Sequence, residues 1–218
     1  MSAYSRAGAT CLVLAPVAGL VSVLAGVPVS GKAGDLASTF TDHPSAARFG
    51  LALNTVAATL LVAGIVWFAV ICREGAPRLA MAGGILGVLG MLAVLFDDAV
   101  HVSGSLVVDG LGVDQARTAL DPLTSGGVLA VGPLSELGDL GLVLLAIAAL
   151  RLGLPRWAAV VLCVGVIGGG IGFGAGSRYL VVAGFALTAV GMAMVVRTVF
   201  ARAELSVPAL RHRAGQPV

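Results

Sequence analysis

The sequence predicts an all-α protein: a polytopic transmembrane helical bundle of about six spans, with residues 1–218 in a single domain. Three observations predict this class. Of the 218 residues, 58% are hydrophobic and only 11% are charged, and the mean hydropathy is +1.04, far from the composition of soluble proteins. Because one span needs about 20 apolar residues, the apolar stretches and their connections use nearly the whole chain and leave no room for a soluble domain.

Hydropathy divides the chain into six apolar stretches. They lie near residues 9–29, 49–71, 79–102, 128–150, 156–176 and 179–200. The first stretch is longer than the apolar region of a usual signal peptide and lacks a clear A-x-A cleavage site, so we expect it to be a retained span.

Two connections are polar and rich in Gly and Pro, and we expect both to leave the bilayer. They are GKAGDLASTFTDHPSAAR, after the first stretch, and GSLVVDGLGVDQARTALDPLTSG, after the third. The second has room for a short amphipathic helix from Val113 to Leu120 on the membrane surface. The remaining connections are predicted to be tight turns.

The distribution of basic residues predicts the orientation, because cytoplasmic loops carry an excess of Lys and Arg. One side carries nine, namely Arg6, Arg73, Arg78, Arg151, Arg156, Arg197, Arg202, Arg211 and Arg213. The other side carries four, namely Lys32, Arg48, Arg117 and Arg178. We therefore expect a multi-pass protein of the inner (plasma) membrane with both termini in the cytoplasm.

Charge and cysteine content exclude several classes of partner. A net charge of +2, with the 13 Lys and Arg scattered singly, argues against nucleic acid and leaves the lipid bilayer as the expected environment. The three cysteines, Cys11, Cys72 and Cys163, form no C-x-x-C pair, so no structural zinc site or redox motif is expected. The oligomeric state is not predicted.

Glycine makes up 31 residues, and many lie inside the predicted spans. Small residues spaced four apart allow helices to approach closely in lipid, so the glycine-rich stretch at 156–176 predicts a central helix. The alternative is that its glycines leave volume for a ligand.

Ionisable residues in the third and fourth stretches are the main functional candidates. Asp97, Asp98 and His101 lie in LFDDAVH, and Glu136 and Asp139 lie in PLSELGDL. Spacings of three and four place each set on one face of its helix. The topology places both sets, together with Asn54, in one layer in the outer third of the bundle.

A simpler interpretation is that these residues are the solvated outer ends of the helices. Against it, moving Glu136 and Asp139 into water would leave only residues 140–150 to cross the membrane before Arg151, which is too short. At least one of the two is therefore expected within the membrane thickness, where a carboxylate needs a partner, a cavity or a proton.

Aromatic residues are predicted at the same depth. Phe96, Phe173, Phe185 and Tyr179 all fall in the outer third of the expected bundle and are candidate substrate-binding residues, since carboxylates beside aromatic side chains are typical of a small-molecule site. The alternative is ordinary packing of these side chains against lipid.

Such a layer supports acid–base chemistry. A carboxylic acid shielded by apolar walls, or sharing a proton with a neighbour, can act as a general acid near neutral pH. We expect Asp97 or Asp98 to donate a proton to an isoprenoid or lipid-like substrate, and Glu136, Asp139 or His101 to accept one.

Other chemistries are less well supported by the sequence. A metal site made by Asp98, His101, Glu136 and Asp139 is geometrically possible, but such ligand sets arise by chance, and we expect neither a metal nor another cofactor. For Ser-His-Asp hydrolysis, Ser103 and Ser105 lie too close to His101, and no G-x-S-x-G is present.

Three segments carry a resemblance: the N-terminal span, TDHPSAARFG before the second span, and ALRLGLPRWAAVVLCVGV late in the chain. They look like small bacterial six-helix membrane proteins grouped as a domain of unknown function, which implies the fold but no activity. The plan is also distantly similar to integral-membrane terpene cyclases, small helical bundles with a few intramembrane carboxylates.

Two other classes remain open. A small-solute transporter or channel subunit would use the same acids as ion or proton sites, although no span shows a clear proline break of the kind expected in transporters. A non-catalytic regulatory membrane protein would need no buried acids.

Overall fold

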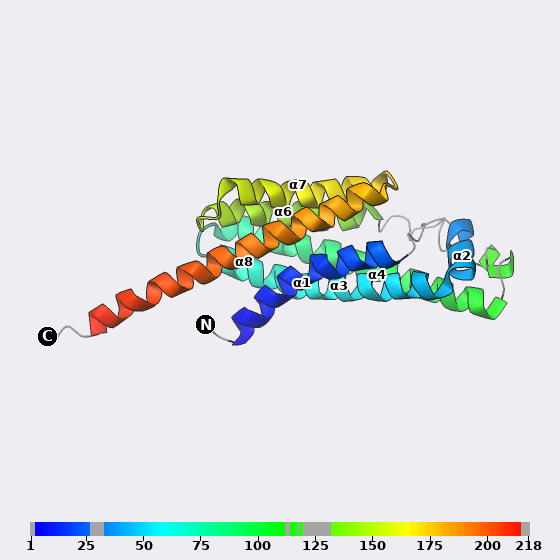
Figure 1. The fold of residues 1–218 in the computed structure, drawn as a ribbon, viewed down its shortest axis with the longest axis horizontal. Coiled ribbons are helices and arrows are strands. Elements are labelled where there is room, and N and C mark those ends of the chain that lie inside the picture. The colour runs from blue at the N-terminus through cyan, green and yellow to red at the C-terminus, as the bar shows by residue number, and fades with distance from the viewer. Residues whose placement is uncertain (1–2, 27–32, 112–113, 117, 120–131, 215–218) are drawn as a thin grey trace.

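The computed structural model describes residues 3–26, 33–111, 114–116, 118–119 and 132–214. Within these ranges, side chains are described except at 33–37, 132–133 and 203–214. The described chain is helical apart from short turns and contains no strand (Figure 1). The helices are α1 (Ala3–Ala25), α2 (Ala33–Asp42), α3 (Pro44–Cys72), α4 (Pro77–Leu111), α6 (Gly132–Leu150), α7 (Arg156–Gly174) and α8 (Arg178–Ala214).

In the described part of the chain, six long helices form a closed ring. They run back and forth along one axis, and both termini lie at the same end (Figure 1). Each packs on the next along the chain, in the order α1, α3, α4, α6, α7 and α8, and α8 returns to pack on α1. The prediction that residues 156–176 form a central helix is therefore wrong, because α7 is one member of the ring and presents Val160 and Ile171 on its outer surface.

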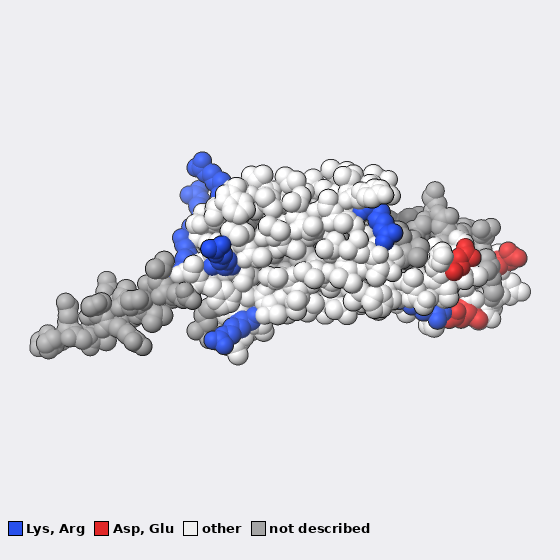
Figure 2. Space-filling model, viewed as in Figure 1, with Lys and Arg blue, Asp and Glu red and all other residues white. Residues whose placement is uncertain are grey.

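The outer surface of the ring is that of a multi-pass membrane protein. By length and composition, α1, α3, α4, α7 and residues 178–202 of α8 can each cross a membrane. α6 has 19 residues and lies between α4 and α7 in the ring. On the face that Figure 2 shows, the middle of the bundle has no charged side chains, and most of the visible Lys and Arg lie at the end that carries the termini. Such helices satisfy their backbone hydrogen bonds internally, as a lipid environment requires.

Glycines allow consecutive helices to pack closely against each other. A Cβ on Gly90 of α4 would collide with the backbone nitrogen of Gly138 on α6. Between α7 and α8, a Cβ on Gly184 would lie 2.5 Å from the nitrogen of Gly169. The packing interpretation of the glycines therefore applies to both of these interfaces.

Helix α2 lies in the first polar connection, for which the sequence analysis proposed no helix. It lies crosswise at the end of the bundle opposite the termini (Figure 1). Phe40 of α2 is 2% exposed and packs in a cluster with Ala47 and Leu51 of α3 and Val108 of α4. This packing explains why α2 forms in a polar segment that hydropathy cannot identify as helix.

The helix ends also differ from the ends of the apolar stretches. α4 continues to Leu111 rather than ending near residue 102, because its last turns pack under α2 and Asp109 pairs with Arg48 of α3. α1 begins at Ala3 and ends at Ala25, earlier than the 9–29 stretch. In the proposed surface helix, residues 114–116 and 118–119 are helical. The remainder of that segment, and residues 128–131 of the fourth stretch, lie outside the described residues.

Candidate functional site

A cavity of about 350 Å³ lies in the middle of the ring and is lined by side chains from all six long helices. On α6 it is lined by residues near the helix start, such as Ser135 and Glu136, and on α7 by residues near the helix end, such as Phe173. Because these positions lie in the half of the bundle away from the termini, the cavity lies in that half.

The other half of the bundle is a packed core. Leu12, Ile65, Trp67, Leu145 and Leu162 are each at most 1% exposed and belong to one apolar cluster. The cavity therefore has an apolar floor, and Leu61, Met91, Val94, Leu142 and Met192 also line it.

Two carboxylates enter the cavity from α6. Glu136 and Asp139 are three residues apart, so they share one face of the helix, and both line the cavity. A Cβ placed on Gly170 of α7 would lie 2.5 Å from Asp139 Oδ2 and 3.5 Å from Glu136 Oε2. The missing side chain of Gly170 therefore makes room for the carboxylate of Asp139, whereas Glu136 would be in ordinary contact with a Cβ at this position.

A third carboxylate, Asp97, lines the cavity from α4. Its Oδ2 lies 3.4 Å from Nδ1 of His101, one turn further along the same helix. The same Nδ1 lies 2.8 Å from the carbonyl oxygen of Asp97. His101 is 8% exposed and does not line the cavity, so its ring supports Asp97 from behind.

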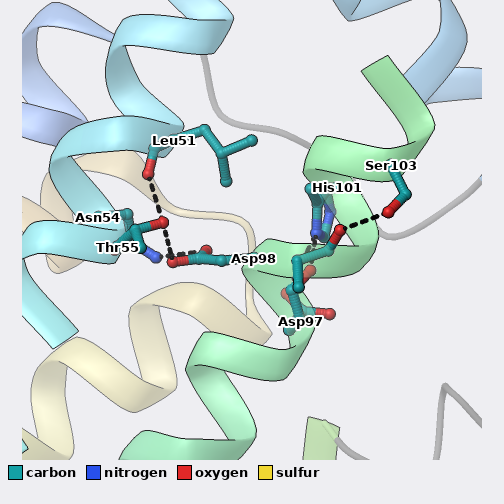
Figure 3. Close-up of polar contacts among 8 residues, drawn as sticks. Leu51, Asn54, Thr55, Asp97, Asp98, His101 and Ser103 are labelled. Carbon is teal, nitrogen blue, oxygen red and sulfur yellow. Dashed lines mark hydrogen bonds and ion pairs between the residues drawn. The ribbon is translucent and has the colours of Figure 1, made fainter. Parts of the chain in front are cut away.

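Asp98 points away from the cavity and toward α3 (Figure 3). It is 4% exposed. Nδ2 of Asn54 donates to its Oδ1 at 2.9 Å, and Oγ1 of Thr55 lies 2.9 Å from its Oδ2. Because Asn54 also lines the cavity, its amide connects the buried Asp98 to the cavity wall.

The predicted aromatic residues separate into two groups. Phe173 and Phe185 both line the cavity, and their rings meet edge to face with centroids 6.1 Å apart. Phe96 and Tyr179 do not line the cavity. Exposure does not separate the two groups, because Phe173 is 59% exposed and Phe96 is 50% exposed.

The structure thus brings six of the ten predicted site residues to one cavity. These are Asn54, Asp97, Glu136, Asp139, Phe173 and Phe185. Asp98 and His101 lie directly behind two of them, whereas Phe96 and Tyr179 lie elsewhere.

Several site residues were not predicted. Thr55 holds Asp98, and Ser135, Thr188 and Pro16 line the cavity. A hydroxyl or a proline inside an apolar stretch is the signal that points to such positions. Pro16 lies inside α1, which continues as one helix from Ala3 to Ala25, in agreement with the expectation that no span shows a clear proline break.

Within the described part of the chain, no group of three His, Cys, Asp or Glu side chains is placed to hold a metal ion. Comparison with protein-family models, with curated proteins and with solved structures finds no match.

Proposed function

We propose that the chain is a six-span protein of the plasma membrane, with its arginine-rich end in the cytoplasm, and that its cavity is the active site of an acid–base enzyme. The substrate is an isoprenoid or similar lipid-like molecule, and the reaction is a protonation and cyclisation of the terpene-cyclase type. One observation carries this proposal: a largely apolar cavity of about 350 Å³ is lined by carboxylates from two neighbouring helices, α4 and α6.

The size and the walls of the cavity support a hydrocarbon substrate. Its volume lies at the small end of the range of roughly 300–1,000 Å³ found for small-molecule sites. A molecule that partitions into the bilayer is already concentrated around this protein, so a site within the bundle suits a lipid-like substrate better than a water-soluble one.

In this reaction the protein itself only donates and accepts protons. A protonated carboxylic acid adds its proton to one alkene carbon, and the electron pair of the double bond forms the new C–H bond, which leaves a carbocation. A second alkene in the chain attacks this cation and closes a ring. Loss of a proton from a neighbouring carbon to a carboxylate then restores a double bond, so the atoms balance without an oxidant or a leaving group.

The residues divide these roles by position. Asp97, on α4, is the proton donor, and Glu136 or Asp139, on α6, is the acceptor. Phe173 and Phe185 stabilise the positive charge, since aromatic ring faces attract cations. Asp98 and His101 act as positioning residues behind Asn54 and Asp97.

The test is conversion of prenylated substrates by purified protein. Because a positioned general acid contributes about 10²- to 10⁴-fold in rate, we expect Asp97→Asn, Glu136→Gln and Asp139→Asn to lose activity by that order. The matched control is Asp109→Asn, whose carboxylate pairs with Arg48 outside the cavity. Full turnover by all three folded cavity variants contradicts the proposal.

A small-solute transporter or channel is the second candidate function. The carboxylates of α4 and α6 that line the cavity can serve as ion or proton sites, as acidic residues within membrane-spanning segments do in transporters. Uptake of a solute into proteoliposomes driven by a pH gradient, with no conversion of prenylated substrates, supports transport over catalysis.

A further inference from the structure

We infer that the cavity selects a protonated amine with a hydrocarbon tail and rejects anionic lipids of the same length. This inference rests on the proposed use of the cavity as a substrate site, and it adds the charge of the ligand. Three observations carry it: the sign of the charges in the wall, an unpaired hydroxyl, and an aromatic pair.

The ionisable side chains that line the cavity are all acidic. Asp97, Glu136 and Asp139 contribute carboxylates, and no Lys, Arg or His occurs among the described lining residues. The side chain of Asp97 is 54% exposed and Glu136 is also exposed, whereas Asp139 is half-buried. All three charges have the same sign, so a phosphate or carboxylate headgroup would be repelled and an ammonium group would be attracted.

The two described arginines at this end of the bundle are already engaged. Arg48 pairs with Asp109, and Nη2 of Arg178 donates to the carbonyl oxygen of Leu24 at 2.7 Å. Neither of them lines the cavity, so neither compensates its negative charge. A cationic ligand would supply that compensation.

Thr188 is the second and independent observation. It lies on α8, is 7% exposed, and lines the cavity. Its hydroxyl makes no hydrogen bond within the described part of the chain. No fully buried side-chain oxygen or nitrogen of the described residues lacks a partner, so this oxygen is open to the cavity and can bond a polar group of a ligand.

The position of Thr188 sets a distance within the ligand. A Cβ on Gly165 of α7 would lie 2.8 Å from Oγ1 of Thr188, whereas the α6 carboxylates lie against Gly170 of the same helix. Five residues of helix rise separate these two levels by roughly 7.5 Å. An amine bound at the carboxylates therefore extends its tail toward Thr188, deeper in the cavity, and a tail that carries a hydrogen-bonding group would have it about 7.5 Å from the amine.

The aromatic pair is the third observation. Phe173 and Phe185 line the cavity, and an ammonium group over an aromatic ring is stabilised by the electrons of the ring face. Two aromatic rings beside carboxylates favour a cation over a neutral alcohol of the same shape.

The experiment compares three probes that share one ten-carbon tail: geranylamine, geraniol and geranyl phosphate. Binding to the full chain in zwitterionic nanodiscs is measured by equilibrium dialysis, with empty nanodiscs subtracted. We expect the amine to bind at least about tenfold more tightly than the alcohol, and the phosphate not to bind. Equal binding of amine and alcohol, or tighter binding of the phosphate, overturns the inference.

Variants test whether the α6 carboxylates are responsible for the binding of the amine. The double variant Glu136→Gln, Asp139→Asn is expected to lose about tenfold or more in affinity for the amine and to bind geraniol unchanged. Asp109→Asn is the control and is expected to bind all three probes as the wild type does. Unchanged amine affinity in the double variant overturns the inference. Should the double variant not fold, the three-probe comparison on the wild type decides alone.

These results are separable from the proposed enzymatic function, because binding is measured without turnover. Selective amine binding without conversion of any isoprenoid leaves the ligand class standing and removes the enzyme proposal. Turnover of isoprenoids without selectivity for charge supports the enzyme proposal and overturns the inferred ligand class.

Discussion

Asp98 and Asp97 are neighbours in sequence but face different surroundings. Successive residues of a helix point about 100° apart, so only one of the two can face the cavity. Asp97 does so, whereas Asp98 faces Asn54 and Thr55 of α3. The spacing in LFDDAVH predicted that these acids lie near each other and near His101. It could not determine which acid meets the cavity, because that depends on how α4 is rotated against α3.

The hydrogen bonds of Asp98 predict different effects for two substitutions. Asp98→Ala leaves the Nδ2 donor of Asn54 without a partner in a buried site, which costs about 1–3 kcal/mol. Asp98→Asn keeps an acceptor for Asn54 and offers a donor to Thr55, whose hydroxyl can then donate to Leu51. Thermal unfolding in detergent should therefore show a larger loss for the alanine variant. Equal losses would mean that the contacts to α3 contribute little.

From the position of Gly170 we predict that one added methyl group displaces an α6 carboxylate. In Gly170→Ala, the new Cβ would have to displace the carboxylate of Asp139, and we expect loss of amine binding or turnover with the fold intact. Gly168→Ala is the matched control, because no described atom lies within 4 Å of its Cβ position. Equal activity of both variants would show that the position of Asp139 is unimportant.

Along the helices, hydropathy locates the apolar segments but not the helix ends. Each predicted span overlaps one long helix of the ring. The polar extensions and α2 were missed because a hydropathy profile detects what can lie in lipid, whereas these segments are stabilised by contacts such as that of Phe40 with Val108. The cavity was also beyond prediction, since its existence depends on the ring order of the helices.

The close packing of α4 and α6 can be tested with a second matched pair of variants. Gly90→Ala would drive a methyl group into the backbone of Gly138, and such overpacking costs about 1–3 kcal/mol. Gly110→Ala, on the same helix, meets no described atom within 4 Å. We expect a lower melting temperature for the first variant and an unchanged one for the second. Identical melting temperatures would contradict the close packing of α4 and α6.

Taken as a complete bundle, the protein has its termini and its arginine-bearing turns at one end. Arg73 and Arg78 flank the turn between α3 and α4, and Arg151 and Arg156 flank the turn between α6 and α7. The up-and-down order of the helices places both turns beside the termini (Figure 1). By the positive-inside rule, we predict that this end is the cytoplasmic one.

Reporter fusions test this orientation. Green fluorescent protein fused after Val218 should fluoresce, and alkaline phosphatase fused within residues 104–125 should be active outside the cytoplasm. The reverse fusions, alkaline phosphatase after Val218 and green fluorescent protein in that connection, serve as controls and should be silent. A fluorescent fusion within 104–125 would invert the topology and would place the cavity nearer the cytoplasm.

The contact between α1 and α8 has a consequence for biogenesis. These helices are farthest apart in the chain, yet they are neighbours in the ring, so the ring can close only after the ribosome has delivered the last span to the membrane. The part of the cavity wall that α8 contributes, which includes Phe185 and Thr188, is therefore the last part to form.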